Sequence, residues 1–198
     1  MNTLKAEKRS MNDKAKKLRR EGYVTGNVFG RSLAESIPVQ IEKKEAEKFL
    51  SVCGKGSEAQ LSLEGQQYDV LVKEVDYDPI KRQTLEIDFQ VLTDGEKVRS
   101  VAEIVLVNHE LVQGVLEQHM EEIPYKAVKS ALVEKVSIDV GSLKPGDSLK
   151  VEDLDIAKDK DVSISPDVLE KVVVSVTEQT YAEAEADDTE TATEGAEG

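Results

Sequence analysis

The sequence has few aromatic residues and almost no cysteine. Aromatic residues make up 4% of the 198 residues and tryptophan is absent, so the hydrophobic core must be packed from Val, Leu and Ile. These core residues favour strands, because β-branched side chains pack well on a pleated surface. Cys53 is the single cysteine, which excludes an intramolecular disulfide and a cysteine-based metal cluster. A lone thiol fits a reducing compartment, and we expect a cytoplasmic protein.

Long hydrophobic runs and catalytic motifs are missing as well. Residues 1–9 lack the apolar stretch of a secretory signal, and no later segment approaches the roughly 18 apolar residues of a membrane span. There is no glycine-rich phosphate-binding motif, and His109 and His119 do not have a metal-ligand spacing. No nucleophile, base and orienting partner can be named together. The sequence therefore predicts a soluble protein with no membrane partner, cofactor, metal or small-molecule substrate, and not an enzyme.

Negative charge is abundant but unevenly distributed. The net charge is -14, which alone argues against a nucleic-acid partner, because such a partner is a polyanion. Residues 1–92 nevertheless hold 16 Lys and Arg against 15 Asp and Glu, whereas residues 93–198 hold 10 against 25. Residues 1–20 alone carry eight basic and two acidic residues. A local basic surface on an acidic protein is the first feature that points to a partner.

Residue patterns predict a compact, mostly antiparallel β unit over residues 1–92. Its two helices are expected at 14–21, capped by Asn12-Asp13 and ended by Gly22, and at 43–52. The expected strands, read from alternation and bounding turns, are 2–8, 24–29, 37–41, 59–63, 68–75 and 85–91.

A polar turn at residues 93–96 is the candidate boundary to a second, β-rich unit over residues 93–177. Strands are expected there at 98–107, 133–140 and 172–176, with a strand, a Pro-Gly turn and a further strand over 143–149. Residues 178–198 are acidic with almost no large apolar side chains, and we expect this tail to be disordered.

The strongest candidate site is the basic segment near the N-terminus. On the expected helix, Lys14, Lys17 and Arg20 follow an i, i+3 row, with Lys16 and Arg19 beside it. Ala15 and Leu18 are left to face the protein, so the long cationic side chains could reach phosphates. The plainer alternative is a solvated helix face, and the clustering of bases on an acidic protein favours RNA binding over it.

Two further residues accompany this helix as candidates. Arg9 lies on the preceding strand, and Phe29 ends a strand beside Gly30, where its ring could stack on an RNA base. The plainer alternative for Phe29 is a core residue.

Several segments together resemble a known family. They are Arg9, residues 14–22, Val28-Phe29-Gly30, residues 72–75 with Asp78-Pro79, residues 87–89, residues 136–140 and residues 146–151. In this order they are similar to the bacterial ribosomal proteins that bind loop E of 5S ribosomal RNA, in the two-domain form described as general stress protein.

The resemblance implies a mainly β fold with short helices. Its N-terminal domain would be a six-stranded antiparallel β-barrel-like domain on the widened minor groove of loop E, followed by a β-rich second domain. It also implies a ribosome-associated location and partners among the large-subunit proteins. The residues expected to contact RNA, from the resemblance and from the basic helix together, are Arg9, Lys14, Lys16, Lys17, Arg19, Arg20, Phe29 and Asp88.

Three positions depart from the family pattern. Phe29 stands where the family commonly has Tyr, Asp76 where it has Gln, and Glu86 where it has His. Asp76 and Glu86 place acceptor-only carboxylates beside a polyanion, which would weaken binding. The alternative function is therefore a stress-related protein-interaction module of the same fold, with weakened or lost RNA binding.

Overall fold

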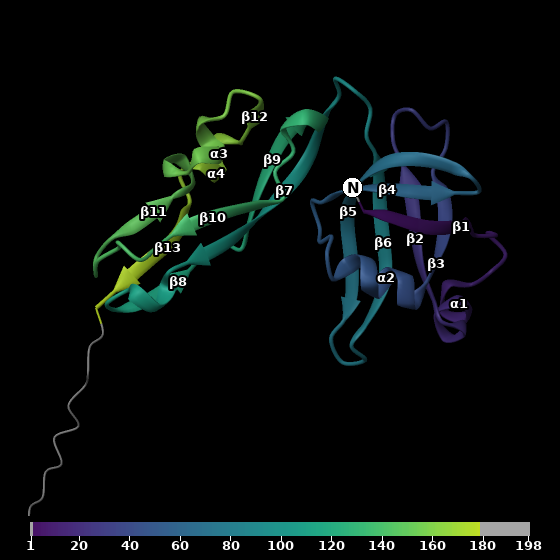
Figure 1. Cartoon of the computed structure of the whole chain (residues 1–198), viewed down its shortest axis with the longest axis horizontal. Helices are drawn as coiled ribbons and strands as arrows, with labels where there is room; N and C mark the ends of the chain where they lie inside the picture. The colour runs from purple at the N-terminus through teal and green to yellow at the C-terminus, as the bar shows by residue number, and fades with distance from the viewer. Residues whose placement is uncertain (1, 179–198) are drawn as a thin grey trace, which may run out of the picture.

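The computed structural model describes residues 2–178, which form two β-rich units joined in sequence (Figure 1). The acidic tail expected at residues 178–198 lies outside the described residues from Gln179 onward. No helix within the described range is long and apolar enough to cross a membrane.

The first unit is a closed six-stranded barrel with the strand order β1-β3-β2-β6-β5-β4. Its strands are β1 (Thr3–Lys8), β2 (Tyr23–Phe29), β3 (Ile37–Glu42), β4 (Glu58–Leu63), β5 (Gln66–Asp78) and β6 (Gln83–Val91). Four neighbouring pairs are antiparallel, while β1 with β4 and β2 with β6 are parallel. The expected mainly β fold with a barrel is confirmed, and the parallel pairs are what close it.

Alternating residues of the strands fill the barrel, and the helix α2 (Lys43–Leu50) packs against it. Phe49 of α2 meets Phe89 with ring centroids 6.5 Å apart. Between β2 and β6 the backbones approach so closely that a Cβ on Gly26 would lie 2.0 Å from the Ile87 carbonyl oxygen. Glycine at this position therefore permits the parallel pair to form.

In the second unit, a four-stranded sheet with the order β10-β7-β9-β12 shares one hydrophobic core with a three-stranded sheet with the order β11-β13-β8. Its strands are β7 (Lys97–Val107), β8 (Val115–Gln118), β9 (Glu122–Val128), β10 (Lys135–Asp139), β11 (Ser148–Lys150), β12 (Val162–Ser163) and β13 (Val172–Thr177). Short helical segments are α3 (Asp155–Lys158), α4 (Pro166–Leu169) and the 3-10 turns η1 (His109–Leu111), η2 (Lys129–Ala131) and η3 (Val151–Asp153). Ile123, Val140, Val151 and Val173 are fully buried in its core.

Some expectations for local structure are wrong. The helix α1 (Ala15–Glu21) has Lys14 as its N-cap and no side-chain cap, so the predicted Asn12-Asp13 cap does not form. The segment at 143–149 is not two paired strands, because Leu143 lies outside the strands and β11 pairs with β13 instead. Strand β9 was missed, although it lies in the middle of its sheet.

The two units are packed against each other. Lys129 donates to the Asp69 carboxylate at 2.6 Å, and Leu71, Leu92 and Val98 form a small buried cluster at the junction. A Cβ on Gly56 would lie 2.2 Å from the Val101 carbonyl oxygen, so the backbones of the two units are in close contact there.

Candidate RNA interface

The basic helix α1 presents its charges outward. Leu18 is buried, and Gly22 ends the helix in the left-handed conformation, with its N–H bonded to the Leu18 carbonyl. The basic side chains that are exposed are Lys14, Lys16, Lys17 and Arg20. Lys17 lies 3.8 Å from Glu21 in an exposed pair, which holds it only weakly. These four exposed cations are free to reach a polyanion.

Arg9 holds the segment that leads into this helix. Its guanidinium donates to the Asp13 carbonyl oxygen from Nε at 3.2 Å and from Nη2 at 2.8 Å. The strand β1 is thereby tied to the turn before α1. A guanidinium has five N–H donors, so the Asp13 bonds leave Arg9 capable of further contacts.

Arg19 lies against the barrel wall instead of pointing into solvent. Its Nε donates to the Leu85 carbonyl oxygen at 3.2 Å, and its Nη2 lies 3.5 Å from Thr25 Oγ1 and 3.7 Å from Glu86 Oε2. The sequence places Arg19 next to buried Leu18, and the helix packing turns it partly inward. Its contacts orient α1 on β2 and β6.

Four carboxylates lie close together on the outer surface of the barrel strands β5 and β6. In the β5–β6 register Glu74 faces Asp88 and Asp76 faces Glu86, and all four line one shallow hollow. Like charges opposite one another repel, so this surface favours cationic or donor groups. Across residues 2–178 no group of three or more His, Cys, Asp or Glu side chains is arranged to hold a metal ion.

Asn27 is the polar residue of this surface that the sequence analysis missed. Its side-chain amide donates to Glu86 and Asp88, each at 3.3 Å, and its backbone N–H donates to Asp88 at 3.1 Å. The outward position of Asn27 in β2, between buried Gly26 and Val28, is the signal that could have identified it. Asp88 is half-buried and held in place by these bonds, which engage its Oδ1 oxygen.

Phe29 ends β2 half-buried and outside the barrel's core cluster. Nearby, a groove of about 820 Å³ lies between the β1–α1 and β2–β3 connections. Its lining includes Lys8, Arg9, Met11 and Asn27, and Met11 is 83% exposed. The groove joins the basic segment to the polar surface of β2.

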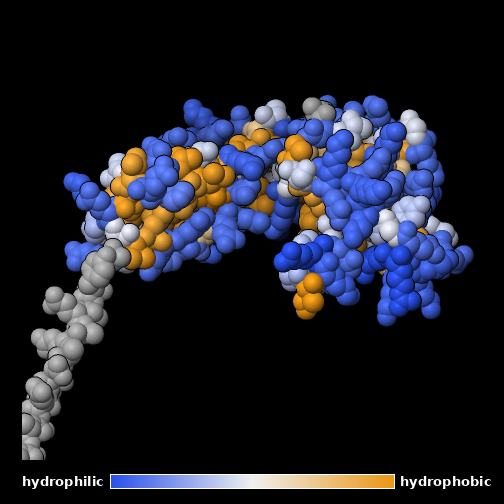
Figure 2. Space-filling view, turned by 60° about the horizontal axis from the view of Figure 1, so that its bottom comes forward, coloured by the Kyte–Doolittle hydropathy of each residue, from blue (hydrophilic) through white to orange (hydrophobic). Residues whose placement is uncertain are grey.

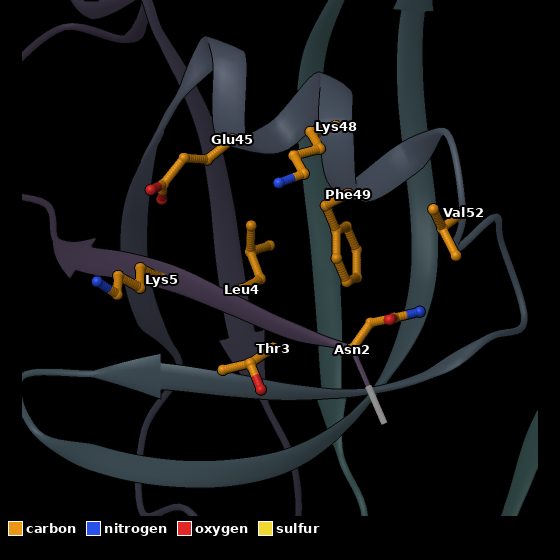
Figure 3. Close-up of a pocket in the computed structure, with 8 residues that line it drawn as sticks. All are labelled: Asn2, Thr3, Leu4, Lys5, Glu45, Lys48, Phe49 and Val52. Carbon is orange, nitrogen blue, oxygen red and sulfur yellow. The ribbon is translucent and has the colours of Figure 1, made fainter.

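A second, smaller cavity of about 260 Å³ lies between β1 and α2 (Figure 3). Figure 3 shows Lys48 above Leu4 and beside the Phe49 ring, while Lys5 extends away to one side along β1. Lys5 is one of the eight basic residues among residues 1–20, but it lines this cavity and lies apart from the cations of α1. Blue hydrophilic side chains dominate the barrel side of the view in Figure 2, and orange apolar ones gather on the second unit.

Comparisons with known proteins cover both units. The model of the Ribosomal L25p family matches residues 4–89, and that of Ribosomal protein TL5, C-terminal domain, matches residues 97–180. The large ribosomal subunit protein bL25 of Bacillus licheniformis is 31% identical over 207 residues, covering 100% of this chain and 98% of the relative. The protein of the same name from Akkermansia muciniphila is 30% identical, covering 86% and 87%.

Proposed function

The chain belongs to the ribosomal L25p family, and from this premise we propose that it binds loop E of 5S ribosomal RNA through α1 and the adjacent strands. The family is one of structural proteins of the large ribosomal subunit and not an enzyme family. Its second unit is of the TL5 C-terminal type, which gives the two-domain architecture.

The single observation that carries the proposal is the outward display of Lys14, Lys16, Lys17 and Arg20 on a helix that is otherwise fixed to the barrel. Exposed cations on a rigid support can neutralise phosphates with little further loss of conformational freedom in the rest of the protein. The proposed binding set also includes Arg9 and Arg19, whose guanidinium groups have N–H donors beyond those bonded within the protein. It further includes Phe29 and Asp88 on the neighbouring strands.

The proposed division of labour follows the two units. Residues 1–92 are the RNA-binding domain, residues 93–177 contact other components of the subunit, and residues 178–198 form an acidic tail.

A second function is supported by the carboxylates at Glu74, Asp76, Glu86 and Asp88, which line one hollow beside α1. A surface with that much negative charge opposes RNA, and it suits a basic protein partner. On this reading the protein would be a stress-related interaction module that keeps the fold and has weakened or lost RNA binding.

Charge reversal on the two barrel helices separates these functions. Lys16→Glu with Arg20→Glu on α1 is compared with Lys44→Glu with Lys48→Glu on α2, which makes the same change in net charge. Binding of the full chain to 5S ribosomal RNA is measured from 50 to 200 mM salt. For about four to six phosphate contacts, the native affinity should fall by about 10² to 10³ over that range, borrowing the duplex coefficient.

The α1 variant should lose affinity and have a flatter salt response, while the α2 variant stays near the native protein. Equal effects of the two variants, or a flat response of the native protein, would support the interaction module instead.

A further inference from the structure

A second row of basic side chains lies on the outer face of the β7-β9-β12 sheet. Arg99 of β7 stands directly opposite Lys126 of β9, and Lys126 stands opposite Ser163 of β12. All three residues are exposed; Arg99 and Lys126 each lie between two buried neighbours, and Ser163 follows buried Val162. The two cations therefore project from the same face, in a unit that is otherwise strongly acidic.

These two cations have no acidic partner within the described residues, whereas two acids on the same face, Glu122 and Glu103, do have basic partners. Glu122 is bound by Lys55 at 2.7 Å, and Glu103 by Lys135 at 3.1 Å. Neither Arg99 nor Lys126 forms an ion pair with any residue from 2 to 178. Like charges facing each other across a strand pair destabilise it, and a bound anion would relieve that repulsion.

The barrel contributes a third cation to this place. Lys73 of β5 reaches across the junction, and its Nζ donates to the Arg99 carbonyl oxygen at 2.7 Å. Burial lowers the pKa of Lys73, and the positive charges of Arg99 and Lys55 lower it further, against the opposing negative charge of Glu74. The positive charges are thus close enough to act on one another.

The cations line a continuous depression across the junction. One hollow of about 360 Å³ is lined by Lys73, Arg99 and Lys126 together with Ser163 and Ser165. The adjoining hollow of about 240 Å³ is lined by Lys55 and Lys73 together with one carboxylate, Glu74, and the two hollows share Lys73, Ser100 and Val101. We call this depression the junction groove.

We propose that the junction groove binds backbone phosphate of ribosomal RNA, as a contact separate from the α1 surface. A guanidinium can hold a phosphate through two parallel hydrogen bonds, an ammonium adds a point charge, and a serine hydroxyl donates one further bond. Arg99, Lys126 and Ser163 supply these three kinds of donor in one row. The groove spans both units, so its occupant would also hold them in their observed arrangement.

The test uses the full chain and two matched double variants. Arg99→Gln with Lys126→Gln removes the charges of the row, and Lys144→Gln with Lys160→Gln removes two charges elsewhere in the same unit. Affinity is measured for isolated 5S ribosomal RNA and for large subunits depleted of this protein, with circular dichroism to confirm folding. The row variant should weaken binding about tenfold in at least one arm and lower its salt slope by about 1 to 2, while the control changes neither.

The two arms distinguish the source of the phosphate. If the row variant binds both isolated 5S RNA and depleted subunits more weakly, the phosphate belongs to 5S RNA. If only the binding to subunits is weakened, the phosphate belongs to other ribosomal RNA. No effect in either arm would overturn the proposal. The α1 variants described above report the loop E contact independently, so either proposal can be refuted while the other stands.

A photoreactive residue identifies what occupies the groove. Ser163→p-benzoylphenylalanine in subunit-bound protein should yield a crosslink that nuclease removes. A crosslink that survives nuclease and is removed by protease would show a protein occupant and overturn the assignment to RNA.

Discussion

Arg19 and Glu86 form an ion pair across the outer face of the barrel, with Nη2 of the guanidinium 3.7 Å from Oε2 of the carboxylate. Asn27 donates to the other carboxylate oxygen at 3.3 Å. Glu86 is thus partly neutralised by the protein, whereas Asp76 opposite it forms no ion pair among residues 2–178. The two departures from the family pattern therefore have different consequences.

Asp76→Gln should tighten binding of 5S RNA by about 1 kcal/mol, the lower end of the range for a polar contact at such an interface. The change removes an exposed negative charge from the proposed RNA surface. Affinity is measured at fixed salt and magnesium, with Glu64→Gln in the β4–β5 turn as a control of equal charge. Weaker binding by Asp76→Gln would mean that the carboxylate itself contacts RNA.

Glu86→Gln should tighten the binding of 5S RNA less than Asp76→Gln does, because it also removes the partner of Arg19. The same affinity measurement compares the two variants.

Arg19→Ala should lower the free energy of unfolding by about 1 kcal/mol, since it deletes the hydrogen bond to the Leu85 carbonyl and the packing of the Arg19 side-chain stem. Arg20→Ala, on the exposed side, should change stability by less than about 0.5 kcal/mol. Urea unfolding measures both, and equal losses would contradict the inward role of Arg19.

Gly26→Ala should prevent normal barrel closure, because its Cβ would lie 2.0 Å from the Ile87 carbonyl oxygen. The contact involves backbone on both sides, so no side chain can move to relieve it. We expect a loss of more than about 3 kcal/mol or failure to fold. Gly54→Ala is the matched control, since a Cβ there meets nothing within 4 Å, and thermal unfolding by circular dichroism compares the two.

Residues 1–92 should fold alone and retain the binding of 5S RNA that depends on α1. The barrel closes entirely within residues 3–91, but the fragment leaves Leu71 and Leu92 without the Val98 side of their cluster. Its melting temperature should therefore be lower than that of the full chain. Circular dichroism and RNA titration test this, and RNA affinity residing in residues 93–198 would refute the domain assignment.

Asp69→Asn should loosen the junction at neutral pH and have little effect at strongly alkaline pH. The hydrogen bond to Asp69, followed by the charges of Asp69 and Glu58, raises the pKa of Lys129 above its ordinary 10.5, against an opposing effect of burial. A raised folded-state pKa gives stability that is complete below 10.5 and is lost as pH rises through the raised value.

The measurement is the difference in melting temperature between the native protein and Asp69→Asn from pH 8 to 11. The difference should shrink above pH 10.5, and titration of Lys73 is common to both proteins and so cancels. A difference that stays constant to pH 11 would show that the charge of Lys129 is not the source of the stability that Asp69 provides.

Most barrel strands could be predicted, because each turns one row of apolar side chains into a closed core and so alternates plainly. Strand β9 was harder, since Pro124 is unfavourable inside a sheet. It is accommodated because β12 pairs only with Lys126 and Ala127, so at Pro124 the strand has β7 as its one neighbour. Such a local gap in pairing has no sequence signal.

The candidate site was predictable as a set of charges but not as a surface. Helical spacing correctly turned Leu18 inward, yet the same rotation brings Arg19 to the Leu85 carbonyl, which depends on where β6 passes. Asn27 gains its role only from the parallel pairing that sets it opposite Asp88. The junction groove combines Lys73 with Arg99 and Lys126, and no local pattern relates those positions.

The barrel's strand order also constrains how the chain acquires its shape. Strand β1 pairs with β3 and β4, and β2 closes on β6, so Gly26 must find Ile87 far along the chain. Contacts of such long sequence separation slow folding, because chain entropy is lost before they form. During synthesis α1 emerges well before Leu85, the residue to which Arg19 bonds. The support of the basic helix is thus complete only when β6 has joined β2, and RNA affinity should appear late, together with the completed barrel.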